Sequence, residues 1–503
     1  MSHALPPAGS GRAGNLNGQW LWVAAAILLA IACFDLIEPA ANLPFRVPRN
    51  INEGWNAYWA IAAVSGGQLY PPMAATISNN YPPVSFFLVG FLGLMTGDPV
   101  LAGRAVALVS FLVVVADIFI WLRLNGVRGS LATAGAAAFV ITLDALSHGS
   151  IATNDPQWLA HAFATTGLVI LWPKQSSTAR LAWAANLAVL GAWVKHLVLP
   201  LPAAIAIWLA RTDPRALWKW AGFAGILSTL FLGAAVAGYG QAFLDGVLSA
   251  PRKFSLGRSA LMARAVLPAL FPLLCLATVT FRHFRRNSAA RFVLLYFVLA
   301  AISAAMASGG DGVSENAFFD VAIAAALAAG LALEELLPCS LHRSPPVSRL
   351  CFALLLPLLI LVVWVPFAFR ANIQRLQSLA AEIQATPDDI QFLRRHGSQR
   401  AACESLSLCF WSDAPFNIDF FNLGQKLKTG RVPMDACSVL FDGAHFSVIQ
   451  MYTLPTTVDS RLPVACNRAM IEHYDVARVS INGVFLLPRP QPHAASMSPA
   501  FTS

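Results

Sequence analysis

Charged side chains are scarce in this sequence: Asp, Glu, Lys and Arg together make up only 12% of its 503 residues. In soluble globular domains about a quarter of all residues are charged. The low charged fraction therefore excludes a chain built from several soluble domains. Hydrophobic residues reach 57%, and the mean hydropathy is +0.61. A long chain of this composition is predicted to be an integral membrane protein, with the lipid bilayer as the solvent of most of its length.

Two further absences narrow the range of functions. No nucleic-acid-binding motif is present, and the formal net charge of +9 comes from Lys and Arg in short clusters between apolar runs. This pattern is typical of membrane-protein loops and excludes nucleic acid as a partner. No C-x-x-C pair occurs among the eight cysteines, which argues against a zinc or thioredoxin-type site.

Long apolar runs divide the chain after a polar tail, residues 1–19, that is predicted to be a disordered cytoplasmic segment. Eleven runs follow, at about 20–37, 99–122, 131–147, 157–173, 181–194, 197–210, 217–237, 265–281, 292–308, 317–336 and 350–368. They predict an all-α polytopic membrane domain of about 11 transmembrane helices over residues 20–370. Val84 to Met95 is too short to cross and is interpreted as an interfacial or re-entrant helix. Residues 181–210 fit one long helix or a hairpin near Lys195-His196, and flanking basic residues favour the hairpin.

The loops between these runs alternate in charge. Basic residues gather in one set of loops, which the positive-inside rule places in the cytoplasm. The opposite loops are 38–98, 148–156, 238–264 and 309–316, so the C-terminus is predicted to lie outside. The third of these is itself basic, and fits an amphipathic surface segment or one that faces an anionic ligand; its cations are Arg252, Lys253, Arg258 and Arg264.

Hydropathy falls from about Ala371, and residues 371–503 are predicted to form a small extracytoplasmic α/β domain. Thr386 to Asp389 resembles a helix N-terminus, while Phe446–Tyr452 and Val484–Leu487 have strand-like patterns. Four cysteines lie here, and in an oxidising compartment they are expected to form one or two disulfides, in any of three connectivities. These cysteines are Cys403, Cys409, Cys437 and Cys466.

The outer loops carry isolated carboxylates among aromatic and neutral polar residues. The first contains Asn52-Glu53-Gly54-Trp55-Asn56-Ala57-Tyr58 and, further on, Asn79-Asn80-Tyr81-Pro82-Pro83, and the second contains Thr153-Asn154-Asp155-Pro156. A carboxylate in hydrogen-bond reach of a hydroxyl can act as a general base. Each has a structural alternative: Glu53 can solvate or cap a loop helix, and Asp155 can cap the helix that follows it.

This arrangement resembles the GT-C glycosyltransferases. The bacterial branch related to protein O-mannosyltransferases and to the lipid A aminoarabinose and galacturonic acid transferases is the most similar in pattern, over residues 20–370. The resemblance implies an inverting enzyme of the bacterial inner membrane. It would move a sugar from a polyprenyl-phosphate donor to an envelope glycan, lipid or protein acceptor on the outer face, with Glu53 or Asp155 as general base. The aminoarabinose-transferase pattern has Asp-Glu where this chain has Asn52-Glu53. A divalent metal requires several oxygen ligands, and each loop supplies only one carboxylate. No cofactor is therefore expected, although a divalent metal is possible.

Other polar residues have two interpretations each. Lys195 lies within apolar sequence and is predicted to contact the lipid phosphate, with His196 beside it, or else to snorkel toward the interface. Arg104 has the same two readings, and snorkelling is favoured. Further candidates for substrate binding are Tyr58, Asn80, Tyr81, Glu315 and Asn316, against interfacial-belt or helix-capping roles.

Two rival functions stay open at this point. A transporter or flippase for lipid-linked saccharides would share the composition, although the inverted repeats and interrupted helices common in transporters are not visible. A catalytically silent relative whose outer domain binds a partner would also share it.

Overall fold

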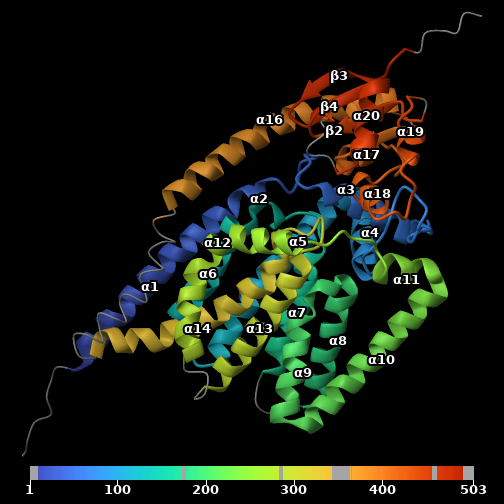
Figure 1. The fold of residues 1–503 in the computed structure, drawn as a ribbon. Helices are drawn as coiled ribbons and strands as arrows, with labels where there is room; N and C mark the ends of the chain where they lie inside the picture. The colour runs from blue at the N-terminus through green and yellow to red at the C-terminus, as the bar shows by residue number, and fades with distance from the viewer. Residues whose placement is uncertain are drawn as a thin grey trace, which may run out of the picture. The chain divides into compact units, whose positions relative to one another are not determined.

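The computed structural model describes residues 10–172, 177–282, 287–342, 363, 365–397, 399–443, 445–455 and 461–490. The chain forms two compact units (Figure 1). The first comprises Met1–Pro71 with Asn79–Ala380, and the second comprises Pro72–Ser78 with Ala381–Ser503. A short piece of the first outer loop therefore belongs to the same unit as the C-terminal residues.

The first unit is helical. Its longer elements are α1 (Ser10–Asp35), α3 (Ile51–Ser65), α4 (Val84–Thr96), α5 (Pro99–Leu124), α6 (Gly129–Ser147), α7 (Gln157–Leu171), α8 (Thr178–Val194), α9 (Pro200–Thr212), α10 (Pro214–Tyr239), α12 (Leu256–Arg282), α13 (Ser288–Ser308) and α14 (Phe319–His342). Short elements join them: α2 (Ile37–Ala41), α11 (Gln241–Leu248), and the 3-10 turns η1 (His148–Ser150), η2 (His196–Val198) and η3 (Glu315–Phe318). The segment that includes α14 is the most enclosed of the long apolar ones, with 89% of its apolar window buried.

The predicted membrane domain is confirmed. Among the described residues, seven helical segments are long and apolar enough to cross a membrane, and three shorter apolar helices accompany them. Every predicted run coincides with a helix except 350–368, of which only 363 and 365–368 are among the described residues. With 13 residues, α4 is as short as expected, and α8 ends at Val194, where the backbone of Lys195 becomes extended (φ −156°, ψ 119°). Residues 181–210 are therefore two helices.

Local signals explain where helices begin. An Asp precedes each of α5 and α10, and a Pro is the first residue of both helices. In each helix the Asp side chain accepts a hydrogen bond from a backbone N–H of the first turn, Val100 and Ala216 respectively, at 3.0 Å. Two boundaries were predicted wrongly. The helix α1 starts at Ser10, inside the predicted polar tail, and α12 starts at Leu256, before the predicted start at residue 265. The first turn of α12 includes Arg258, whose guanidinium is satisfied by hydrogen bonds that it donates to the carbonyls of Gly310 and Val313.

The second unit is an α/β domain around a four-stranded sheet of order β1-β2-β4-β3. The strands β1 (Ala401–Cys403) and β2 (Val448–Met451) are parallel, and β4 (Gly483–Pro488) runs antiparallel to β2 and to β3 (Tyr474–Ser480). The predicted strands correspond to β2 and β4. In the described part of this unit, four short helices accompany the sheet: α17 (Leu406–Trp411), α18 (Phe420–Lys428), α19 (Ala436–Leu440) and α20 (Val464–His473). The loop segment 72–78 joins this unit through Lys426, whose ammonium donates to the carbonyls of Ala75 and Ile77.

Covalent bonds tie this unit together: disulfides join Cys403 to Cys409 and Cys437 to Cys466. The predicted helix start at Thr386 is wrong, because α16 (Val365–Gly397) runs through Pro387 without a break. Asp389 does not cap a helix. Its carboxylate accepts hydrogen bonds from Arg478 and Ser480 of β3, at 2.7 and 2.6 Å, and so attaches α16 to the sheet.

Candidate active site

Glu53 lies in the first turn of α3, which begins where the Asn50 side chain accepts a hydrogen bond from the Asn52 backbone. Its carboxylate forms a two-pronged ion pair with Arg104 of α5, in which Nε donates to Oε1 at 2.6 Å and Nη2 donates to Oε2 at 2.7 Å. Both side chains are 0% exposed. The backbone N–H of Arg49 also donates to Oε2, at 3.0 Å, so both oxygens of Glu53 are occupied.

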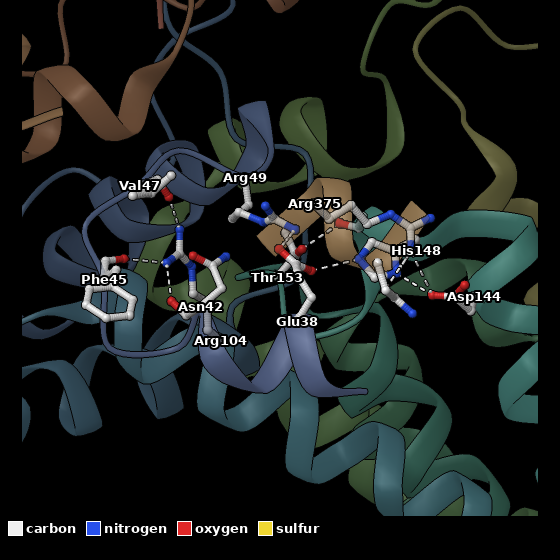
Figure 2. Close-up of polar contacts among 12 residues, drawn as sticks. Glu38, Asn42, Phe45, Val47, Arg49, Arg104, Asp144, His148, Thr153 and Arg375 are labelled. Carbon is white, nitrogen blue, oxygen red and sulfur yellow. Dashed lines mark hydrogen bonds and ion pairs between the residues drawn. The ribbon is translucent and has the colours of Figure 1, made fainter. Parts of the chain in front are cut away.

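Arg104 is surrounded by acceptors. Its two terminal nitrogens donate to the carbonyls of Phe45 at 2.7 Å, Val47 at 2.5 Å and Asn42 at 3.4 Å (Figure 2). The prediction that Arg104 snorkels toward the interface is therefore wrong. A guanidinium has five donors, and here the connection between α2 and α3 supplies carbonyls that sequence spacing alone does not reveal.

Asn154 connects this pair to the second outer loop. Its backbone N–H donates to Oε1 of Glu53 at 3.2 Å, and its side-chain amide donates to the Glu53 carbonyl at 3.0 Å. Asn56 donates in turn to the Asn154 carbonyl at 2.7 Å. Gly103 leaves the necessary room, since a Cβ there would lie 1.8 Å from Oδ1 of Asn154. Glu53 and Asn56 thus hold Asn154, the residue before Asp155, and Arg104 holds Glu53.

Asp155 pairs with Lys195. The Lys195 ammonium donates to Oδ1 of Asp155 at 2.8 Å, and the same oxygen accepts from the Gln157 backbone at 2.8 Å, at the start of α7. Lys195 is 1% exposed, whereas the Asp155 side chain is 13% exposed. Among the described residues no hydrogen bond is made to Oδ2 of Asp155. Asp155 thus caps α7, as one interpretation predicted, and keeps one oxygen available.

Tyr81 completes this group. Its ring centroid lies 4.7 Å from Nζ of Lys195, and Trp55 packs edge-on against the ring at 5.1 Å. Burial raises the pKa of the Tyr81 hydroxyl, against the opposing effect of the Lys195 charge, and the charge of Arg252 acts in the same direction as that of Lys195. Burial alone would lower the pKa of Lys195, but Asp155 and Tyr81 raise it above the ordinary value, so the ammonium is protonated. We call Asp155, Lys195 and Tyr81 the Asp155 group.

The comparison with solved structures identifies this arrangement of helices. The chain is similar to ArnT from Cupriavidus metallidurans, solved bound to undecaprenyl phosphate and in the apo state, with a TM-score of 0.58 and 12% identity. That match covers 94% of this chain and 99% of ArnT. The chain has the GT-C fold. The Archaeoglobus fulgidus oligosaccharyltransferase, solved with a tethered acceptor peptide, matches with a TM-score of 0.51 and 11% identity, over 90% of this chain and 72% of that one. No protein-family model and no curated protein matches the sequence.

Within this GT-C fold, the other predicted site residues lie at several places. His196 follows Lys195 in η2 and is exposed, while Tyr58 lies half-buried on α3 and Asn80 half-buried just before Tyr81. Glu315 and Asn316 lie in η3, between α13 and α14, and no described hydrogen bond joins them to the Asp155 group. Asp117 of α5 is not one of the predicted site residues, and its carboxylate accepts hydrogen bonds from the hydroxyls of Thr165 and Thr166, at 2.7 and 2.8 Å.

A second polar network in the helical unit contains no residue that the sequence predicts for the site. His148 lies between Glu38 and Asp144: its Nε2 is 2.7 Å from Glu38, and its Nδ1 contacts Asp144 (Figure 2). Arg49 pairs with Glu38 at 2.5 Å, and Arg375 of α16 lies 3.4 Å from Asp144. Charges within apolar sequence are a signal for buried partners, and Glu38 and Asp144 carried that signal. This network joins α2, α6 and α16 and holds the start of the loop that carries Asp155.

No metal site stands out in the part of the chain that the structure describes: no three His, Cys, Asp or Glu side chains there are arranged to hold an ion. Metal independence stays a prediction. One cavity of about 10 Å³ lies beside Asp155, lined by Asn56, Ser85, Gly103, Asn154 and Asp155 among others. A volume of this size holds at most one water molecule.

Proposed function

We propose that this protein is an inverting glycosyltransferase that moves a sugar from a polyprenyl-phosphate donor to an envelope glycan, lipid or protein acceptor. The Asp155 group carries this proposal, because it places an available carboxylate oxygen next to a buried, protonated lysine. The GT-C fold supports it, and so does the undecaprenyl phosphate bound to ArnT, a protein of similar structure.

Asp155 is the proposed general base. In the reaction the acceptor hydroxyl passes its proton to Oδ2, and the acceptor oxygen forms a bond to the anomeric carbon of the sugar. The bond from that carbon to the phosphate oxygen breaks on the opposite face, so the configuration inverts, and polyprenyl phosphate leaves with the electron pair. The capping bond from Gln157 and the ion pair with Lys195 both use Oδ1, which leaves Oδ2 for the proton.

Lys195 is proposed to hold the donor phosphate. The leaving phosphate gains negative charge as the bond breaks, and a cation placed there in advance stabilises that charge. An ammonium has three donors, so Lys195 can retain Asp155 while it binds a phosphate oxygen. The charge of Arg252 is close enough to act on Tyr81, so this arginine of the basic outer loop adds to the positive potential.

Glu53 is proposed to position the loop and not to act as the base. A carboxylate that already accepts from Arg104, Arg49 and Asn154 has little capacity left for a substrate proton. Its contacts instead hold Asn154 and, through the peptide bond, the backbone of Asp155. The remaining candidates, Tyr58, Asn80, His196, Glu315 and Asn316, stay proposals for sugar or acceptor contacts.

We also propose a bacterial inner membrane location, with the Asp155 group and residues 371–503 on the outer face. The basic loops on the opposite side support this orientation. A topology reporter fused after Ser503 should be active outside the cytoplasm, and a reporter active only in the cytoplasm would reverse the assignment.

The deciding experiment measures transfer of radiolabelled sugar from a polyprenyl-phosphate donor in proteoliposomes. Asp155→Asn should abolish most transfer, while Asp98→Asn is the matched control: Asp98 also precedes a proline and caps a helix on the same side. Normal turnover of Asp155→Asn would refute the base assignment. If wild-type protein only equilibrates the labelled lipid between leaflets, the protein is a flippase.

A further inference from the structure

A large cavity lies at the other end of the helices that carry the Asp155 group. Its volume is about 690 Å³, within the range of about 300–1,000 Å³ that is typical of ligand sites. It lies between the C-terminal ends of α5, α7 and α9 and the N-terminal ends of α10 and α13. Nothing in the proposed transfer reaction uses it.

The cavity is separated from the Asp155 group by the length of a helix. Asp155 precedes α7, whereas Leu171 and Trp172, at the other end of α7, line the cavity. The 15 residues of α7 span about 22 Å at 1.5 Å per residue. The loops at the cavity end are those with the basic clusters, so the positive-inside rule places the cavity at the cytoplasmic membrane surface.

Aromatic rings form one wall. Trp172, Trp208 and Phe292 pack against one another with ring centroids 5.0 to 6.2 Å apart. Trp172 is oriented by a hydrogen bond from its indole nitrogen to Oδ1 of Asn125, at 2.9 Å. Tryptophan is enriched at the level of lipid head groups, where one side of the ring meets acyl chains and the other meets polar groups.

Among the described residues, the polar part of the lining contains one charge of each sign. Arg291 of α13 lies with its Cζ 5.9 Å from the centroid of the Trp208 ring, and Asp213 precedes α10. One oxygen of Asp213 caps α10 by accepting from Ala216 at 3.0 Å. Neutral donors and acceptors, Thr212 and Ser288 among them, complete the lining. A ligand with a balanced pair of charges and an apolar part matches this set.

We propose that this cavity binds a zwitterionic phospholipid from the inner leaflet. The phosphate would contact Arg291, the ammonium would contact Asp213, and the acyl chains would lie along the aromatic wall. An anionic lipid would satisfy Arg291 but would place no cation against Asp213. This site is independent of the glycosyltransferase chemistry proposed for the Asp155 group.

The test uses the full-length protein in detergent, titrated with dioctanoyl phosphatidylethanolamine or dioctanoyl phosphatidylglycerol and followed by native mass spectrometry. Wild-type protein should bind one phosphatidylethanolamine about tenfold more tightly than phosphatidylglycerol. Arg291→Gln should weaken the binding of both lipids by roughly ten- to a hundredfold, the effect expected when a hydrogen bond to a charged group is lost. Arg180→Gln is the matched control, because this exposed arginine begins α8 on the same side and does not line the cavity.

Asp213→Asn separates charge from capping. Asparagine keeps the helix cap, so this variant should fold normally and lose only the preference for phosphatidylethanolamine. Thr212→Trp should reduce the binding of both lipids by filling space without a change of charge. Equal binding of the two lipids by wild-type protein, or an Arg291→Gln variant that binds normally, would overturn the proposal. Displacement of the lipid by millimolar glycerophosphoethanolamine, which has no acyl chains, would assign the site to a soluble phosphate ester instead.

Discussion

Glu53 and Asp155 both lie at the start of a helix, Glu53 in the first turn of α3 and Asp155 just before α7, and each pairs with a buried cation. Their surroundings nevertheless differ. Glu53 is fully buried, and each of its oxygens accepts at least two hydrogen bonds, from Arg104 and from backbone N–H groups. Asp155 is partly exposed and uses one oxygen for both of its contacts. The comparison teaches that an ion pair does not by itself mark a catalytic carboxylate, because the number of lone pairs left for a substrate decides that role.

The largest expected effect is on catalysis by Asp155. Asp155→Asn keeps a side-chain oxygen for the cap but removes the base, so transfer should fall by about 10²–10⁴-fold, the usual range for general-base catalysis. The variant also leaves the buried Lys195 ammonium without its counter-charge, so the melting temperature of the purified protein should fall, but by less than for Glu53→Gln because Asp155 is partly exposed. A loss of stability as large as that of Glu53→Gln, together with the loss of transfer, would place Asp155 with Glu53 as a structural residue.

Glu53→Gln should act mainly on stability. It leaves the Arg104 guanidinium buried without its counter-charge, and breaking such a pair is expected to destabilise the fold by about 3–5 kcal/mol. Thermal unfolding in detergent measures this effect. The double variant Glu53→Gln/Arg104→Met removes both charges and should recover part of the loss. If Glu53→Gln unfolds like wild type but has lost transfer, then Glu53 and not Asp155 is the base.

Gly103→Ala tests the connection between the two regions. The added Cβ would collide with the Asn154 side chain, which lies against Gly103 in the structure, and overpacking typically costs about 1–3 kcal/mol. The melting temperature should fall, and transfer should fall with it because the backbone of Asp155 shifts. Gly222→Ala on α10, where a Cβ meets nothing within 4 Å, is the control and should lower neither quantity, since alanine is the better helix former.

The smallest effect is expected at Tyr81. Tyr81→Phe keeps the ring beside Lys195 and removes only the hydroxyl, a polar neighbour that, after Asp155, helps to raise the pKa of Lys195. Loss of one polar contact of this kind is worth roughly 1 kcal/mol, so KM for the polyprenyl-phosphate donor should rise by a few fold while stability stays the same. Tyr81→Leu should raise KM further, because it also removes the ring. An unchanged KM in both variants would separate Tyr81 from the donor site.

Part of the candidate site could be predicted from sequence. Asp155 as a helix cap, and Lys195 as a buried cation at a break between helices, both follow from local sequence and are present in the structure. The snorkelling predicted for Arg104 was wrong, and its ion pair with Glu53 was not predicted, because each residue was considered without the other. Their side chains meet across 51 positions of the chain, and no local pattern indicates such a partner. His148 and Glu38, 110 positions apart, were missed for the same reason.

The sequence by itself determined the membrane class, the order and type of most helices, and the strands β2 and β4. The physical reason is that in a bilayer every backbone polar group must be satisfied within its own segment, so long apolar runs can only be helices. Tertiary structure alone decided which carboxylate keeps a free oxygen and which cation each one meets. Those outcomes depend on how α3, α5 and α7 pack and on the space that Gly103 leaves for Asn154. Packing of this kind joins residues far apart in the chain, where periodicity and composition carry no information.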